Sequence, residues 1–415
     1  MTRIVISVGI GLLLTVGTVW AGPLEDATAA YKRGDYVTAL KIIQPLAAQG
    51  NVEAQYNLGA LYANGAGVPQ SDTMARQWYE KAAAQGNANA QTNLGVLYDQ
   101  GHGVSQDYTK ARQWYEQAAT QGDANAQINL GLLYDNGQGV PQDYKKAAQW
   151  YEQAATQGNA RAQFNLGMLY EHGQGVPQDY AAARGWYEKA AAQGDVNAQT
   201  NLGLLYDNGQ GVPQDYSMAR QWWEKASAQG DAEAQNNLGT LYAFGRDVPQ
   251  DYGKARQWYE KAAAQELAAA QGNLGALYVE GKGMPQDYAK ARQWWEKAAA
   301  QGLAAAQYNL GALYRGGQGV PQDYSMARQW WEKASAQGLA AAQNNLGTLY
   351  RDGLGVPQND MRAYMWFNGA AASAGLAQKT AADNRDYVAR RMTPAQLAEA
   401  QRLASQCQAR QFKGC

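Results

Sequence analysis

The chain has little of what enzymes and metal proteins use for chemistry. Its 415 residues include two histidines, His102 and His172, and two cysteines, Cys407 and Cys415. We expect no metal ion between the histidines, because they take different places in repeats two apart. Charge of one sign is also lacking, since 35 basic residues balance 36 acidic ones. This balance favours neither nucleic acid nor an anionic membrane surface as a partner, and we expect no cofactor.

Long apolar runs are absent except at the N-terminus, where Arg3 precedes an uncharged stretch from Ile4 to Trp20. Small residues at Val19 and Ala21 predict a signal peptide over 1–21 that is cleaved after Ala21. A retained membrane anchor is the alternative, but this glycine-containing stretch is short for a bilayer span. No cysteine follows it, which excludes a bacterial lipoprotein anchor. We therefore expect a periplasmic or secreted protein with no stable membrane insertion after cleavage.

What the sequence has in abundance is repetition. The string Leu-Gly-x-Leu-Tyr recurs nine times at 36-residue intervals, from Leu58 to Leu346. A unit of this size can form two helices but cannot bury both apolar faces alone, so the copies must stack around one continuous core. We predict an all-α solenoid of αα-hairpins with these domains: a degenerate N-terminal capping repeat over 22–50, nine repeats over 51–374 and a C-terminal helical cap over 375–415.

The second repeat shows how each hairpin is expected to form. Asn87 is predicted to cap a first helix over 88–100, which the glycines around His102 end. Asp107 is predicted to cap a second helix, which ends at Gly122. Apolar residues at helical spacing give each helix one core-facing side.

The nine internal copies show which side chains the fold requires. We predict that Gly59 and its equivalents let neighbouring helices approach, and that Gln91 and Asn93 with their copies bond to loop backbone. Tryptophan also recurs once per repeat, on the second helix. We predict that this stripe is core rather than a cofactor site: Trp78, Trp114, Trp150, Trp186, Trp222, Trp258, Trp294, Trp330 and Trp366.

These repeats resemble the Sel1-like repeat family, which is related to tetratricopeptide repeats. The matching pattern, read from Ala124 to Gly158, is A-x-A-Q-x-N-L-G-x-L-Y-x-x-G-x-G-V-P-Q-D-Y-x-x-A-x-x-W-x-x-x-A-A-x-Q-G. The resemblance implies a right-handed superhelix that acts as a scaffold or adaptor for a protein or peptide partner. Exported bacterial members resemble envelope-assembly, signalling or host-interaction proteins.

Two other functions are compatible with this resemblance. A cysteine-rich branch of the family has been grouped with penicillin-binding or β-lactamase-like proteins, which makes a hydrolase one alternative. The chain lacks the S-x-x-K, S-D-N and K-T-G triplets of those enzymes, and no repeat carries cysteine, so we do not expect an enzyme. A binder of envelope polysaccharide or peptidoglycan is the other alternative, and it would need exposed aromatic platforms along one face.

A partner would contact positions that vary between repeats and face away from the core. On the first helix of repeat 2 these are predicted to be Ala88, Thr92, Val96 and Asp99. The Asp99 position changes from acidic to basic along the array. A solvated face that drifted in sequence is the alternative to a partner-binding stripe. The stripe is predicted to lie on the concave surface and to comprise Thr92, Asp99, Ile128, Asp135, Phe164, Glu171, Asp207, Tyr308, Arg315 and Arg351.

The C-terminal segment departs from the repeat. Helices are predicted near 377–391 and 394–411, the second beginning with a capping box at Thr393, and both should cover the last repeat. Cys407 and Cys415 are predicted to form a disulfide, because an export signal implies an oxidising compartment. Two free thiols on a frayed end are the alternative.

Repeats 6 and 7 are predicted to form the softest joint of the array. Asp247 and Glu266 stand where the other repeats have glycine, and Gly253 and Gly272 enter helices. A left-handed cap without glycine and a glycine inside a helix each cost about 1 kcal/mol.

Overall fold

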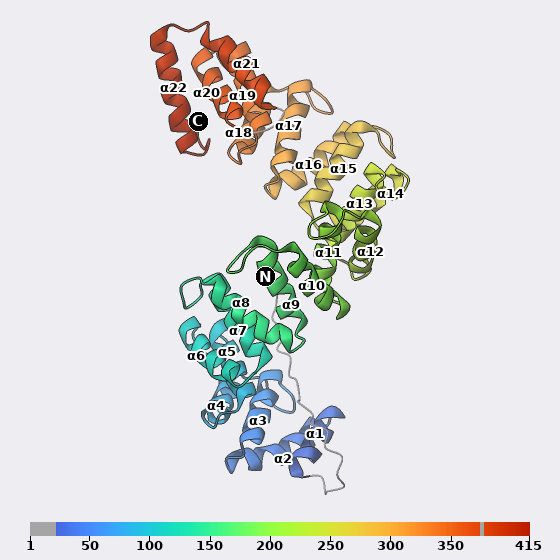
Figure 1. Cartoon of the computed structure of the whole chain (residues 1–415), viewed down its shortest axis with the longest axis vertical. Helices are drawn as coiled ribbons and strands as arrows, with labels where there is room; N and C mark the ends of the chain where they lie inside the picture. Colours follow the sequence, from blue (N-terminus) through green and yellow to red (C-terminus); the bar gives the residue numbers. More distant parts are fainter. Residues whose placement is uncertain (1–21, 374–376) are drawn as a thin grey trace. The chain divides into compact units, whose positions relative to one another are not determined.

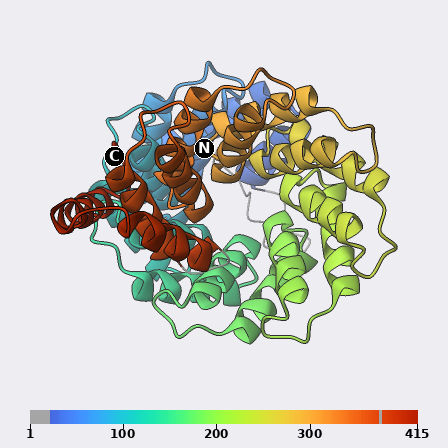
Figure 2. The same cartoon turned by 90° about the horizontal axis from the view of Figure 1, so that it is seen from above.

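The computed structural model describes residues 22–373 and 377–415, which form 22 α-helices and no β-strand. They belong to two compact units, unit 1 up to Gln214 and unit 2 from Asp215 onward. Within each unit, successive helices form antiparallel pairs that follow one another along the chain (Figures 1 and 2). The signal peptide predicted for 1–21 lies outside the described residues.

Each repeat contributes a first helix and a second helix. The first helices are α3 (Val52–Asn64), α5 (Ala88–Gln100), α7 (Ala124–Asn136), α9 (Ala160–His172), α11 (Val196–Asn208), α13 (Ala232–Phe244), α15 (Ala268–Glu280), α17 (Ala304–Gly316) and α19 (Ala340–Asp352). The second helices are α4 (Asp72–Ala84), α6 (Tyr108–Thr120), α8 (Tyr144–Thr156), α10 (Tyr180–Ala192), α12 (Tyr216–Ala228), α14 (Tyr252–Ala264), α16 (Tyr288–Ala300), α18 (Tyr324–Ser335) and α20 (Asp360–Ala371). The ends add α1 (Pro23–Lys32), α2 (Tyr36–Ala48), α21 (Ala377–Ala389) and α22 (Pro394–Ala409).

Polar caps and glycines set the helix boundaries where the sequence predicted them. The Asn87 side chain accepts a bond from Ala90 N at 2.8 Å, and Gly101 ends α5 in a left-handed conformation at φ 73°. Asp107 caps α6 by accepting from Lys110 N at 3.0 Å. The side chains satisfy backbone N–H groups that have no partner inside the helix.

The glycine of the repeat string makes room for an aromatic ring on the second helix. A Cβ added to Gly131 would lie 2.6 Å from Cε1 of Tyr151, whose side chain is fully buried. The predicted packing role of this glycine is therefore confirmed. The rings that fill this place in the other repeats, apart from repeat 5, are Tyr79, Tyr115, Tyr187, Tyr259, Trp295, Trp331 and Phe367.

The tryptophan stripe predicted to be core lies at the edge of the core, where most of the rings pack against buried clusters. Trp78 and its equivalents as far as Trp330 are half-buried, and only Trp366 is fully buried, with 1% of its surface exposed. The deeply buried aromatic is instead the next residue, which lies about 100° further round the helix. In six repeats a lysine ammonium lies 3.8–4.5 Å from the tryptophan ring centroid: Lys81, Lys189, Lys225, Lys261, Lys297 and Lys333.

The C-terminal helices cover the last repeat. Buried Val388 of α21 and buried Ala400 and Ala404 of α22 pack in one cluster with Phe367 of α20. The capping box at Thr393 is present. Arg391 pairs with Asp360 of α20 at 3.2 Å, so this arginine belongs to the contact between the cap and the last repeat.

A disulfide joins Cys407 and Cys415, whose Cα atoms are 5.7 Å apart. It closes a turn that carries Phe412, and the Phe412 ring stacks on Trp366 with centroids 6.1 Å apart. The disulfide pairing predicted from the sequence is confirmed in the structure.

Asp247 and Glu266 do adopt left-handed backbone, at φ 56° and 64°. Glu266→Gly should raise the stability of repeats 6 and 7 by about 1 kcal/mol, because glycine has no Cβ to strain this conformation. The register-matched change Gly230→Glu should lower stability by a similar amount, since a Cβ there would meet only open space and the strain is purely conformational. Denaturant unfolding, with hydrogen exchange over 243–273, measures both. A destabilised Glu266→Gly variant would contradict the strain.

Candidate functional site

One side of each first helix stays open to solvent, and we call it the open face. It comprises the equivalents of Asn89, Asn93, Val96 and Gln100, which recur at helical spacing, although Ala60 and Val96 are buried in repeats 1 and 2. In repeat 3 these are exposed Asn125 and Asn136 with half-buried Leu132, while Asn129 is buried. The predicted stripe was centred about one residue away. The prediction placed Leu94 and Leu97 in the middle of the buried side, whereas Thr92 and several of its equivalents are buried as well.

The prediction that Thr92 and Ile128 face solvent is wrong, because only 6% and 3% of their surfaces are exposed. This position packs on the cap of the next repeat. Thr92 Oγ1 donates to Asp123 Oδ1 at 3.0 Å, whereas a Cβ at Gly272 would lie 2.9 Å from Leu303 Cδ2. The variation at this position is therefore accounted for by contacts between repeats.

Phe164 and Tyr308, at the same position, are half-buried. Phe164 packs on Tyr187 with ring centroids 5.7 Å apart, and Tyr308 packs on Trp331 at 6.5 Å. Each ring covers the buried aromatic of its own repeat, so both residues have a structural role beside any contact with a partner.

The acidic residues of repeats 2 to 4 lie beside the open face and bond to buried tyrosines. The hydroxyls of Tyr115 and Tyr151 donate to Asp99 Oδ2 at 3.3 Å and to Asp135 Oδ2 at 3.1 Å. In repeat 4 the Tyr187 hydroxyl donates to Glu171 Oε2 at 2.5 Å. Each bond fixes a half-buried carboxylate in place.

Burial controls the protonation of these pairs. Desolvation raises the pKa of the Asp99 and Asp135 carboxyls above their ordinary value, and the tyrosine hydrogen bond opposes this shift. Burial, followed by the charge of Asp99, raises the pKa of Tyr115 well above its usual range. The tyrosines are therefore neutral donors at physiological pH.

The remaining residues of the predicted stripe differ in their burial and in the hydrogen bonds that their side chains make. Asp207 is half-buried and Arg315 is exposed. Arg351 donates to Asp352 at 2.7 Å and to Asn384 of α21 at 3.1 Å. Arg351 thus helps to hold the C-terminal cap, whereas the structure records no bond for the Arg315 side chain.

A chain of glutamines lies behind the open face. Buried Gln91 donates to the carbonyl of Ala83, at the end of α4, and accepts from Gln121 Nε2 at 2.7 Å. Gln127 and Gln157 repeat this bond one repeat later. The prediction that Gln91 bonds to loop backbone is wrong in its partner, because Ala83 lies inside α4. Asn201, an equivalent of Asn93, instead donates to the Tyr187 hydroxyl at 3.2 Å.

The open faces of the two units differ in chemistry. At the Val96 position, unit 1 carries half-buried Leu132, Met168 and Leu204, whereas unit 2 carries the smaller residues Thr240, Ala276, Ala312 and Thr348. Unit 1 is therefore the more apolar of the two surfaces.

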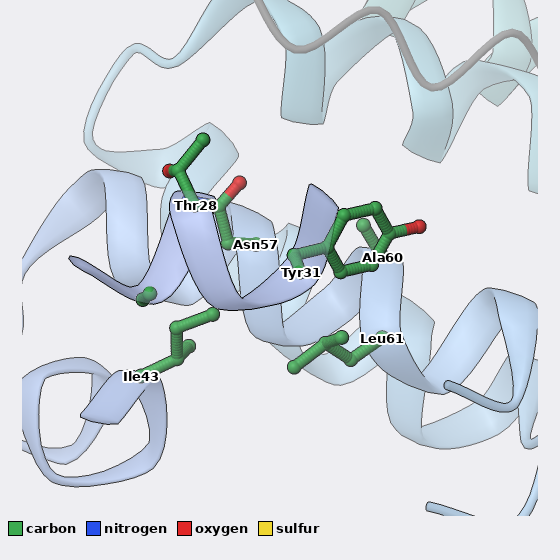
Figure 3. A pocket seen from close by; sticks show the side chains of 7 residues that line it. Thr28, Tyr31, Ile43, Asn57, Ala60 and Leu61 are labelled. Atoms are coloured by element: carbon green, nitrogen blue, oxygen red, sulfur yellow. The ribbon is translucent and has the colours of Figure 1, made fainter. Parts of the chain in front are cut away.

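An apolar pocket lies at the N-terminal end of unit 1, between α1, α2 and α3. Its lining comprises Ala27, Thr28, Tyr31, Ile43, Asn57, Ala60 and Leu61, around a small cavity of about 20 Å³ (Figure 3). The sequence reasoning missed this pocket. The signal that could have found it is a run of small residues in 27–30 facing Ala60.

We find no sign of a catalytic or metal centre in the part of the chain that the structure describes. His102 and His172 are both exposed. Over residues 22–373 and 377–415, no three histidine, cysteine or acidic side chains are grouped as metal ligands. No helix of these segments is both long enough and apolar enough to cross a membrane.

Comparison with known proteins settles the family. The sequence model of the Sel1 repeat matches nine consecutive segments: 52–87, 88–123, 124–159, 160–195, 196–231, 232–267, 268–303, 304–339 and 340–374. The chain belongs to the Sel1 repeat family. Sel1 repeats build helical solenoids, a scaffold fold typical of protein–protein interaction. A search of curated proteins found no match.

Two solved structures share both sequence and fold with this Sel1-repeat chain. A protective antigen of uropathogenic Escherichia coli strains, which displays an SLR fold, is 34% identical with a TM-score of 0.61, and the match covers 94% of this chain and 92% of the antigen. A Sel1 repeat protein of Oxalobacter formigenes is also 34% identical, with a TM-score of 0.55 and coverage of 72% and 91%.

Proposed function

We propose that the chain is an exported, non-enzymatic scaffold that binds a protein or peptide partner through the open faces of its first helices. One observation carries the proposal. The open face changes from repeat to repeat, from Leu132 and Met168 to Ala276 and Ala312, whereas the leucines and the glycine of the repeat string are the same in all nine copies. A solenoid needs constant core positions, whereas variable surface positions give each part of the array its own chemistry.

The predicted stripe residues that keep solvent contact are retained in this proposal. They border the open face and supply charged and aromatic groups, which are common at protein interfaces. Thr92 and Ile128 contribute by positioning the next repeat instead. The proposed partner-binding residues are Asp99, Asp135, Phe164, Glu171, Asp207, Tyr308, Arg315 and Arg351.

A polysaccharide partner has less support. Sugar rings stack on open aromatic faces, and the half-buried tryptophan stripe of the second helices is a candidate series. Lysines cover six of these rings, such as Lys189 at 3.9 Å from the Trp186 centroid. The lysine would have to move away before a sugar could stack.

Export is supported by the disulfide between Cys407 and Cys415. Disulfides persist in oxidising compartments such as the periplasm and are rare in the cytosol. Together with the apolar N-terminal run, this bond favours a periplasmic or secreted location.

Site-specific photo-crosslinking in the native cell envelope tests the proposal. A photoreactive side chain at exposed Asn125 or Ala312 of the first helices should capture a protein partner, which mass spectrometry identifies. The controls are Gln113 and Gln329, which are exposed at matching places on the second helices. Capture only from the second helices would overturn the assignment of the open face.

A further inference from the structure

The apolar pocket and the open face of unit 1 are parts of one surface. Two residues that line the pocket, Asn57 and Ala60, are the repeat 1 equivalents of Asn93 and Val96. The pocket therefore lies where the open face of unit 1 begins. Figure 3 shows both residues on α3, facing the helix that carries Thr28 and Tyr31.

One of the polar groups at this pocket is available to form a hydrogen bond with a ligand. The Thr28 hydroxyl already donates to the carbonyl of Leu24 at 2.8 Å. Asn57 is half-buried at the lining, and the structure records no hydrogen bond for its amide. An amide in this place can bond to the backbone of a bound peptide, while Ile43 and Leu61 surround an apolar side chain.

Further along unit 1, past buried Val96, the open face is apolar and has acidic neighbours. Leu132, Met168 and Leu204 supply the half-buried apolar groups. At the positions that form or border the open face, unit 1 carries one arginine, Arg161. Five carboxylates accompany it: Glu53, Asp99, Asp135, Glu171 and Asp207. This excess of negative charge complements a cationic partner.

The spacing of the carboxylates sets the spacing of the cations. Neighbouring packed helices lie about 8–10 Å apart, and an extended chain advances about 3.4 Å per residue. Consecutive first helices pack on the second helices between them rather than on one another, so their carboxylates lie at least this far apart and a peptide that crosses them uses three or more residues per repeat. This spacing is no shorter than the Debye length of about 8 Å at physiological salt, so each carboxylate acts mainly on its nearest cation.

We infer that unit 1 binds an extended cationic peptide segment, which places the tip of one apolar side chain in the small pocket between α1, α2 and α3 and basic side chains against Asp99, Asp135 and Glu171. The inference rests on the proposed scaffold function and names the partner chemistry for its N-terminal unit. The tyrosine hydrogen bonds hold these carboxylates in position before the peptide binds, which lowers the entropy lost on binding.

A fluorescein-labelled peptide of about ten residues is the probe, with leucine at one end, lysine at every third position and serine between. Its anisotropy is measured with the purified full chain at low and physiological salt. The lysine peptide should bind, and its affinity should fall as the salt concentration rises. A peptide with glutamate for lysine should not bind, and one with alanine for leucine should bind more weakly.

Variants of the protein test the named residues. The triple change Asp99→Asn, Asp135→Asn, Glu171→Gln should weaken binding about tenfold, because each exposed ion pair contributes a modest amount. The control triple Glu116→Gln, Glu152→Gln, Glu188→Gln removes the same charge from the second helices of the same repeats and should leave affinity unchanged. Equal losses in both triples would overturn the inference.

Filling the pocket tests the apolar anchor. Ala60→Leu and Thr28→Leu should each weaken binding of the leucine peptide but not of its alanine counterpart, and a thermal melt checks that each variant folds. Ala276→Leu, at the matching place in repeat 7, is the control. Unchanged binding by a folded Ala60→Leu or Thr28→Leu variant would overturn the anchor.

The outcomes separate this inference from the proposed function. Native crosslinks confined to the first helices of unit 2, with no binding of the lysine peptide, would overturn the inference and leave the scaffold function standing. Crosslinks absent from every first helix would overturn both.

Discussion

Gly131→Ala should destabilise the protein by about 2–3 kcal/mol, the upper part of the range for overpacking a core. The added Cβ would lie 2.6 Å from Cε1 of Tyr151, which is closer than two carbon atoms can approach. Tyr151 has little freedom to move away, because its side chain is fully buried and its hydroxyl donates to Asp135 at 3.1 Å. The helix pair of repeat 3 must therefore separate, although alanine favours helix more than glycine does.

Gly185→Ala provides the matched control. Gly185 lies inside α10, and a Cβ there would meet no atom within 4 Å. The change should stabilise α10 by up to about 1 kcal/mol through helix propensity alone. Denaturant and thermal midpoints, with hydrogen exchange in α7 and α8 for local unfolding, measure both variants. If Gly131→Ala also stabilised the protein, the close packing of α7 on α8 would be wrong.

The double change Cys407→Ser, Cys415→Ser should cost the C-terminal cap about 2–3 kcal/mol. A disulfide that closes a loop of this length restricts the unfolded chain by about that amount. In the folded chain the bond also keeps Phe412 stacked on Trp366 and against Gly369. Without it, the segment after α22 should fray and expose Trp366.

Hydrogen exchange at the end of α22 and in α20 reports this loss, and it should stay small in unit 1. Ser405→Ala, a change on the exposed side of α22, is the control. Intact-mass measurement of the native protein, with and without reductant, should show a gain of two hydrogens on reduction. A cap that exchanges equally slowly in the double variant would show that the disulfide adds no stability.

The helix boundaries could be predicted from the sequence because residues close to each boundary determine it. Asn87 and Asp107 cap helices wherever they recur, and glycine ends them, because these residues satisfy or permit specific backbone conformations. The same reasoning found the left-handed Asp247 and Glu266. These features depend on neighbours a few residues away, which the sequence shows directly.

Which side of each helix is buried could not be predicted from such local features. A helical wheel assumes one buried side, but α5 is buried by its own second helix and by the neighbouring repeats. Thr92 is therefore buried against the next cap, and the open face turns toward Asn93 and Val96. For the same reason Tyr115, and not Trp114, fills the space beside Gly95. The pocket escaped prediction because α1 and α2 depart from the repeat pattern.

The glutamine chain bears on how this array could change its length. Gln91 bonds to Ala83, eight residues before it, and to Gln121, thirty residues after it. The bond to Ala83 joins adjoining copies and the bond to Gln121 lies within one copy. Both recur in repeats 3 and 4, so removal or duplication of 36 residues among these copies would bring an equivalent partner into reach. Recombination between near-identical copies could therefore shorten or extend the protein while the same hydrogen bonds form at each new junction between repeats. The number of carboxylates and apolar groups offered to a partner would then vary in whole steps, one repeat at a time.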